Sequence, residues 1–278
     1  MKFTKMHGCG NDYVYVNLLT EKVDDYEKAA IKVSDRHFGI GSDGLIMIDK
    51  SDVADFRMIM YNADGSRGKM CGNGIRCVAK FVYDHGMTDK TTLNIETDAG
   101  IKILELNVLN GKVQTVRVNM GEPELVPANV PVIFEGDRMI NEEIIVNGEP
   151  VKITAVSMGN PHAVTFVPEV DNLDLEKIGP YYEKHELFPE RINTEFIKVI
   201  SENELSMRVW ERGSGETFAC GTGACASAVA AYLNGLTGRE VLIHLRGGDL
   251  NILYNEDDNC VYMTGPATTV FEGEIELD

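Results

Sequence analysis

The segment Cys71–Gly86 reads CGNGIRCVAKFVYDHG, and Cys220–Gly235 reads CGTGACASAVAAYLNG. Both run from Cys-Gly-x-Gly through an apolar stretch to a closing glycine, and they lie 149 residues apart. An apolar stretch of this length that ends in glycine is typical of a helix with a glycine C-cap. Each half of the chain is therefore predicted to contain one glycine-led helix.

The same offset of 149 residues relates other segments. Gly10-Asn11 corresponds to Gly159-Asn160, and DFRMIMY at 55–61 corresponds to ELSMRVW at 204–210. The loops that follow, NADGS and ERGSG, align without a gap. One offset shared by separated segments indicates an internal duplication, so two similar halves are expected.

Composition narrows the class of protein. The chain has 278 residues, 26 Lys and Arg against 44 Asp and Glu, a net charge of −18 and 44% hydrophobic residues. This is a globular composition, and at roughly 150 residues per domain it predicts about two domains. A surface this acidic would repel nucleic acid. No apolar run approaches the roughly 18 residues of a membrane span, and MKFTKMHGCGND does not read as a secretory signal. The expected location is the cytoplasm.

Short β-branched and aromatic runs predict many strands and few helices, which favours an α+β fold. Three proline residues in 120–132 indicate a linker. The expected helices are 24–34, with Asp24 and Glu27 as a capping box, 73–84 and 222–233. The expected strands are 3–6, 13–17, 45–48, 56–61, 91–97, 101–106, 113–119, 151–156, 163–167, 197–200, 206–210, 241–245, 250–253 and 261–264.

Cys71 and Cys220 each precede a predicted helix. The free N–H groups and partial positive charge of a helix N-terminus favour a thiolate, so both thiol pKa values are expected to fall. The adjacent glycines allow backbone N–H groups to approach an anion such as a carboxylate. Cys77 and Cys225 lie within the apolar stretches and are expected to be buried. CxxC spacing is absent from the sequence, which disfavours a metal or redox centre.

Two equivalent cysteines on two pseudo-symmetric halves suggest one chemistry if the halves face each other. One thiolate would remove a proton from a ligand carbon and the other thiol would deliver a proton to the opposite face. This arrangement inverts a stereocentre without a cofactor or metal, as in a racemase or epimerase that acts next to a carboxylate.

Five motifs carry a resemblance to the diaminopimelate epimerase family, whose members need no pyridoxal phosphate. They are HGCGNDYVYVN from His7, YNADGSRGKMCGNGIRC from Tyr61, GNPHAV from Gly159, INTEF from Ile192 and ERGSGETFACGTGACA from Glu211. They occur in the family's order over nearly the whole chain. The resemblance implies two pseudo-symmetric halves, each a mostly antiparallel sheet wrapped around a central helix, with the active site in the cleft between them. The implied halves are 1–120 plus 267–278, and 121–266.

The resemblance also implies the reaction and the residues that carry it out. The reaction interconverts LL- and meso-diaminopimelate in lysine and peptidoglycan precursor biosynthesis, with Cys71 as proton donor and Cys220 as acceptor. His162 and Glu211 are implied to be important for catalysis. The implied substrate-binding residues are Asn11, Asn62, Gly72, Asn73, Asn160, Asn193, Glu211, Arg212, Gly221 and Thr222. The implied partner is this small molecule; assembly as a homodimer is also implied, with neither nucleic acid nor membrane bound.

Two positions depart from the family pattern. Gly44 stands where many members have a substrate-binding Gln, so that side-chain contact is lost. Phe271 stands where many members have an interface Tyr.

A disulfide between Cys71 and Cys220 is also expected on oxidation.

Three alternatives stay open at this point. A related proline racemase or hydroxyproline epimerase shares paired cysteines in Cys-Gly-x-Gly settings. A thiol-based metal-binding or redox protein would use the same residues without isomerase activity. An isomerase on the same fold with a carboxylate base is disfavoured by the presence of both cysteines.

Overall fold

The computed structural model describes residues 1–277 and divides into two units. The N-terminal half comprises Met1–Asn119 and the segment that begins at Thr264, and the C-terminal half is Met120–Met263. The chain therefore passes between the halves within strands β8, Lys112–Gly121, and β17, Val261–Pro266. Asp278, the last residue of the expected N-terminal half, lies outside the described residues.

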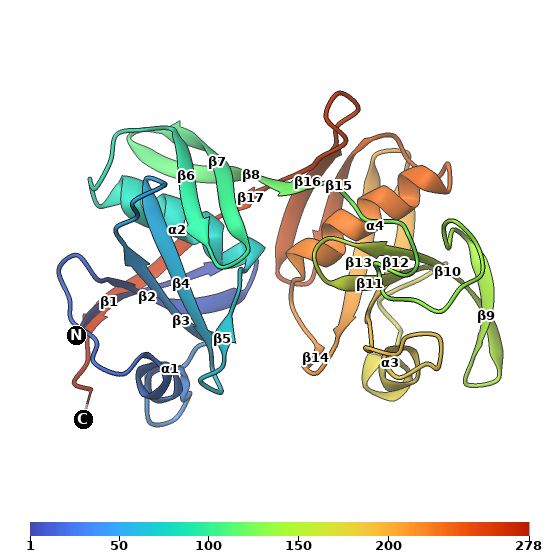
Figure 1. The fold of residues 1–278 in the computed structure, drawn as a ribbon, viewed down its shortest axis with the longest axis horizontal. Coiled ribbons are helices and arrows are strands. Elements are labelled where there is room, and N and C mark those ends of the chain that lie inside the picture. The colour runs from blue at the N-terminus through green and yellow to red at the C-terminus, as the bar shows by residue number, and fades with distance from the viewer. Residues whose placement is uncertain (278) are drawn as a thin grey trace. The chain divides into compact units, whose positions relative to one another are not determined.

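The N-terminal half is a curved, mostly antiparallel sheet around helix α2 (Figure 1). Its strands pair in the order β18, β1, β2, β3, β4, β6, β7 and β8, with β5 beside β4. The β2–β3 and β4–β6 pairs are parallel. The bounds are β1 Lys2–Gly8, β2 Asn11–Asn17, α1 Tyr26–Ser34, β3 Gly44–Asp49, β4 Phe56–Asn62, β5 Arg67–Gly68, α2 Gly72–Asp84, β6 Thr92–Thr97, β7 Gly100–Leu109 and β18 Thr268–Glu274.

The C-terminal half repeats this topology around helix α4 (Figure 1). Its strands pair in the order β9, β10, β11, β12, β13, β15 and β16, with β14 beside β13. The parallel pairs are again two, β11–β12 and β13–β15. The bounds are β9 Glu142–Val146, β10 Glu149–Ser157, β11 Pro161–Phe166, α3 Leu175–Glu183, β12 Asn193–Ser201, β13 Glu204–Glu211, β14 Gly215–Glu216, α4 Gly221–Leu233, β15 Glu240–Leu245 and β16 Gly248–Tyr254.

The predicted α+β fold with two similar halves is confirmed, and the offset of 149 residues holds for the helices. α2 and α4 start at Gly72 and Gly221, and each has 13 residues. Parallel strand register repeats as well: Val14 pairs with Leu45, and Ala163 pairs with Thr194. The duplication therefore preserves the register of the backbone.

Each central helix is buried because its sheet curves around it. α2 packs against β1, β2 and β7, while α4 packs against β10, β11, β12, β15 and β16. Cys77 and Cys225, inside these helices, have 0% exposure, as predicted. Burial of most residues of α2 and α4 fixes where their first turns point.

Helix α3 was not predicted. It lies 149 residues after α1, and the two helices share the same length of 9 residues and an N-cap aspartate, Asp25 or Asp174. Applying the repeat offset to the helix predicted at 24–34 would have found it. Pro180 within α3 hides the pattern, although its missing N–H is tolerated in this short helix.

Local boundaries differ in three places. Asp25, not Asp24, caps α1, because its side chain accepts a hydrogen bond from Lys28 N. The segment 120–132, predicted to be a linker, is part of the C-terminal half, because Val130 and Val132 are buried in its hydrophobic core. Strand β9 and the short strands β5 and β14 were also missed.

Of the helices in residues 1–277, none has the length and apolarity to cross a lipid bilayer.

The fit of α3 against β13 generates a prediction. A Cβ at Gly179 would lie 2.3 Å from the Trp210 ring, although alanine is the better helix former. Gly179→Ala is expected to lower the free energy of unfolding by about 1–3 kcal/mol, since overpacking outweighs helix propensity. Thermal unfolding followed by circular dichroism measures this. Gly238→Ala is the control, because a Cβ there meets open space. An unchanged melting temperature for Gly179→Ala would show that Trp210 moves aside freely.

Candidate functional site

Cys71 is the N-cap of α2, where it has an extended backbone with φ −132° and ψ 119°. Gly74 N donates a hydrogen bond to Cys71 Sγ at 3.3 Å, and the thiol donates to Asn11 Oδ1 at 3.2 Å. Tyr13, which is buried, also hydrogen-bonds to Cys71 through its hydroxyl group. The thiol therefore sits at the free N–H groups of a helix, as the Cys-Gly-x-Gly pattern predicts.

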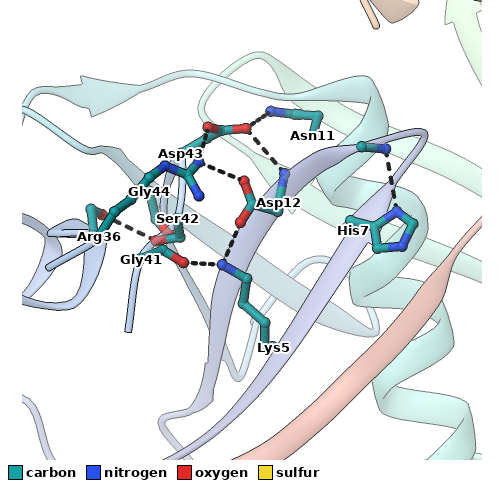
Figure 2. Close-up of polar contacts among 11 residues, drawn as sticks. Lys5, His7, Asn11, Asp12, Arg36, Gly41, Ser42, Asp43 and Gly44 are labelled. Atoms are coloured by element: carbon teal, nitrogen blue, oxygen red, sulfur yellow. Dashed lines mark hydrogen bonds and ion pairs between the residues drawn. The ribbon is translucent and has the colours of Figure 1, made fainter. Parts of the chain in front are cut away.

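A network of charged residues orients Asn11 (Figure 2). Asn11 Nδ2 donates to Asp43 Oδ2 at 2.8 Å, so its carbonyl oxygen faces Cys71. Arg36 donates to both Asp12 and Asp43 at 3.0 Å, and Lys5 pairs with Asp12. Burial acts to raise the pKa of Asp12, but Arg36 and Lys5 hold it below its usual value. Burial and the charge of Asp12 raise the pKa of Asp43.

The other predicted residues of this half lie on neighbouring elements. Asn62 ends β4 and donates to Ser66 Oγ at 2.9 Å. Gly72 and Asn73 form the buried first turn of α2, and Asn73 Oδ1 accepts from Arg76 Nη2 at 3.0 Å. The structure thus places Asn11, Gly72 and Asn73 near Cys71 in one half-site.

Position 44 is closed to any side chain. A Cβ on Gly44 would lie 2.2 Å from Tyr61 O and 2.9 Å from Tyr13 Cε1. The side chain that many family members carry here has no room unless β4 moves. The ring of Tyr13 lies in this space, and its hydroxyl group hydrogen-bonds to Cys71. Sequence reasoning did not single out Tyr13.

Cys220 occupies the same position in the C-terminal half as the N-cap of α4, with φ −116° and ψ 108°. Its Sγ lies 3.5 Å from Thr222 Oγ1 and makes no side-chain capping bond. Gly221 and Gly223 in the first turn are buried. Cys220 is itself only 5% exposed.

His162 and Glu195 lie beside Cys220, both fully buried. His162 Nδ1 is 2.7 Å from Glu195 Oε1, and Nε2 is 3.1 Å from Asn160 Oδ1. Burial raises the pKa of Glu195, whereas the charge of His162 acts against this. Glu195 was not predicted as a site residue, although it lies in the INTEF motif and is a charged residue in a buried strand, which is the signal that would have found it.

The remaining predicted residues lie at the start of β12 and at the end of β13 with its loop. Asn193 is buried, donates to Pro161 O at 2.9 Å and accepts from Arg212 N at 2.9 Å. Glu211 accepts a hydrogen bond from Thr217 Oγ1. The Arg212 side chain is exposed, and its Nη1 donates to Glu190 O at 2.8 Å. Asn193 thus connects β12 to the Glu211–Arg212 loop.

The prediction that the helix N-termini lower both thiol pKa values is wrong for this structure. Burial raises the pKa of Cys71, against the opposing effects of the Gly74 N–H, Tyr13 and Arg76. Burial raises the pKa of Cys220 further, and here the negative charges of Glu211 and Glu195 add to it. Desolvation outweighs the helix N-terminus because the thiolate loses its water when the first turn is buried. The two half-sites are therefore electrostatically unequal.

One group of side chains within residues 1–277 has donor atoms close enough for a metal ion to be considered: His162, Glu195 and Cys220, whose atoms lie within 4.8 Å of one another. The 2.7 Å contact between His162 and Glu195 already uses one donor atom of each. We therefore treat these residues as a hydrogen-bonded cluster. All six cysteines are free thiols, so the expected disulfide stays a prediction for oxidised protein.

The unequal half-sites predict unequal thiol reactivity. Only a thiolate is alkylated, so a raised pKa slows the reaction at pH 7.5 and the rate climbs as pH rises toward that pKa. Cys71 is expected to react faster with iodoacetamide than Cys220, and Cys220 is expected to accelerate at a higher pH. Peptide mass spectrometry on ligand-free protein from pH 7 to 10 reports both rates in one sample. Faster reaction of Cys220 at neutral pH would contradict the higher pKa assigned to this thiol.

Comparisons with known proteins agree with this geometry. The family model described as diaminopimelate epimerase matches residues 3–126 and 154–270. The diaminopimelate epimerases of Agathobacter rectalis and Methanococcus maripaludis are 61% and 58% identical to this chain, with 100% of each chain covered. The crystal structure of a probable proline racemase from Agrobacterium radiobacter has a TM-score of 0.73 at 13% identity, covering 100% of this chain and 93% of that one, which shows a shared fold. The chain belongs to the diaminopimelate epimerase family and is an isomerase.

Proposed function

We propose that the enzyme interconverts LL- and meso-diaminopimelate by two-base proton transfer at the α-carbon, with Cys71 and Cys220 as the two bases. The observation that carries the proposal is the repeated placement of a cysteine as the N-cap of a glycine-led helix whose first turn is buried. Relatives at 61% and 58% identity named diaminopimelate epimerase support the substrate. The reaction would serve lysine and peptidoglycan precursor biosynthesis.

In the proposed reaction, Cys220 as thiolate removes the α-proton of the LL isomer, and Cys71 as thiol delivers a proton to the opposite face. The S–H bond formed on Cys220 balances the one broken on Cys71, and the roles exchange in reverse. The scheme requires both thiols to reach opposite faces of one α-carbon. It consumes no oxidant or reductant, and it uses neither a cofactor nor a metal.

The helix N-termini fit the charge that develops in this reaction. Proton removal shifts negative charge onto the neighbouring carboxylate, and N–H groups at Gly72-Asn73 and Gly221-Thr222 would stabilise it. Burial of these turns strengthens such interactions by excluding water. This is why the same burial that raises the thiol pKa values also supports the carbon-acid step.

The remaining polar residues suit a diamino diacid. Asn11, Asn62, Asn160 and Asn193 can donate and accept hydrogen bonds without adding charge. Glu211 would accept from an ammonium group, and the exposed guanidinium of Arg212 would bind a carboxylate through two parallel hydrogen bonds. His162 would act beside Cys220 without touching the α-carbon.

A proline-type racemase remains the second candidate, since a probable proline racemase shares the fold with a TM-score of 0.73. Proline has one carboxylate and one amine, so it gives Glu211 and Arg212 no distal groups to bind. The diamino diacid is therefore the better match. We further propose a homodimer, for which the exposed Val270 and Phe271 on β18 offer an apolar surface, and a cytoplasmic location.

Solvent isotope incorporation tests the substrate. Reduced protein incubated with LL-diaminopimelate in D₂O is expected to give meso product carrying one α-deuterium, since the proton delivered comes from a thiol that exchanges with solvent. Chiral chromatography with mass spectrometry measures both. Folded protein that forms no meso product and incorporates no deuterium, but racemises proline, would move the assignment to the second candidate.

Cysteine variants test the two bases. Cys71→Ser and Cys220→Ser are each expected to reduce epimerisation by about 10²–10⁴-fold, because a serine hydroxyl is a far weaker acid than a thiol. Cys260→Ser is the matched control, since Cys260 lies outside both first turns, and it should keep near-normal kcat/KM. A single variant at position 71 or 220 that keeps near-normal kcat/KM would contradict the two-base scheme.

A further inference from the structure

Glu195 is a buried charge that the proposed reaction does not use. Its side chain has 0% exposure, and Oε1 accepts from His162 Nδ1 at 2.7 Å. Its second oxygen, Oε2, has no hydrogen-bond partner. Burying a carboxylate with one oxygen unsatisfied costs stability, so a compensating role is expected.

The repeat shows that the fold itself does not need this charge. The equivalent residue in the N-terminal half, 149 positions earlier, is Ile46. The two side chains occupy the same place: a Cβ on Gly74 would lie 2.6 Å from Ile46 Cδ1, and one on Gly223 would lie 2.4 Å from Glu195 Oε1. An apolar side chain therefore satisfies this packing, and the carboxylate is particular to the half that holds Cys220.

The contacts of His162 give the second observation. Nδ1 faces Glu195 Oε1 and Nε2 faces Asn160 Oδ1, so both ring nitrogens lie against oxygen acceptors. An imidazole satisfies two acceptors only when both nitrogens carry hydrogen, which is the imidazolium form. The ionisable groups that act on this pair from neighbouring elements are Glu211 on β13 and Cys220 at the N-terminus of α4.

We propose that Glu195 is a positioning residue that keeps His162 in its imidazolium form beside Cys220, so that the Cys220 thiolate forms next to a cation. The inference deepens the proposed role of Cys220 and rests on it. The pair neither gains nor loses a proton during turnover: His162 keeps both hydrogens, and the proton that moves is carried by Cys220. Glu195 supplies the negative charge that holds the imidazolium in place.

The charge state of His162 is the direct test. In wild-type protein at pH 7.5, nitrogen-15 NMR of the histidine side chains is expected to show His162 with both nitrogens protonated. Glu195→Gln should remove one of these protons. Glu204→Gln is the matched control, because it breaks another His–Glu contact of 2.7 Å, that of His244, on the surface of the same half. A neutral His162 in the wild type would overturn the proposal even if no variant folds.

Thiol alkylation then tests the consequence for Cys220. Glu195→Gln should slow the reaction of Cys220 with iodoacetamide at pH 7.5 by about tenfold, while Cys71 in the same protein keeps its rate. If Glu195 acts only through its own negative charge, the variant accelerates Cys220 instead, and the proposal fails. An unchanged alkylation rate of Cys220 would also contradict the proposal. Neither measurement uses substrate, so a wrong substrate assignment would leave both results interpretable.

Discussion

The first turns of α2 and α4 approach the adjacent strands so closely that a Cβ at Gly74 or Gly223 would displace a strand side chain. A Cβ at either position would lie within 2.6 Å of a strand side chain. Because packing in a protein core leaves little free space, this close approach determines the position of each helix N-terminus and of its N-cap cysteine. The positions of both thiols follow from it, as do their burial and the supply of free N–H groups around them.

On this common backbone the two halves have diverged in charge. The N-terminal half carries Ile46 beneath its first turn and the buried cation Arg76 one turn further along α2. The C-terminal half carries Glu195 and, in place of the arginine, Cys225. Near Cys71 the buried charge is positive, and near Cys220 the carboxylates of Glu211 and Glu195 are negative, with His162 in contact with Glu195. Two thiols at equivalent N-cap positions therefore differ in how readily they ionise.

Much of this could be predicted from the sequence because the duplication is preserved in register. The Cys-Gly-x-Gly segments fixed both central helices to within one residue, and alternating β-branched runs located most strands. Helix α3 was not predicted because Pro180 lies within it and interrupts the helical sequence pattern, although the position of α3 follows from that of α1 by the repeat offset. The thiol pKa values were predicted in the wrong direction because burial arises from strands distant in sequence. Glu195 could have been found as a charged residue in a buried strand, but its contact with His162, 33 residues away, could not be read from the sequence.

Gly44 shows how a duplicated site can become fixed in an unequal state. Its equivalent, Asn193, retains a side chain that connects β12 to the Glu211–Arg212 loop, whereas position 44 is enclosed by the Tyr61 carbonyl and the Tyr13 ring. A single substitution cannot restore a side chain there, because the backbone of β4 and Tyr13 would have to shift together. Such a position is an epistatic trap: a side chain can enter it only through several coordinated changes, so the difference between the two halves at this pair of positions is hard to reverse.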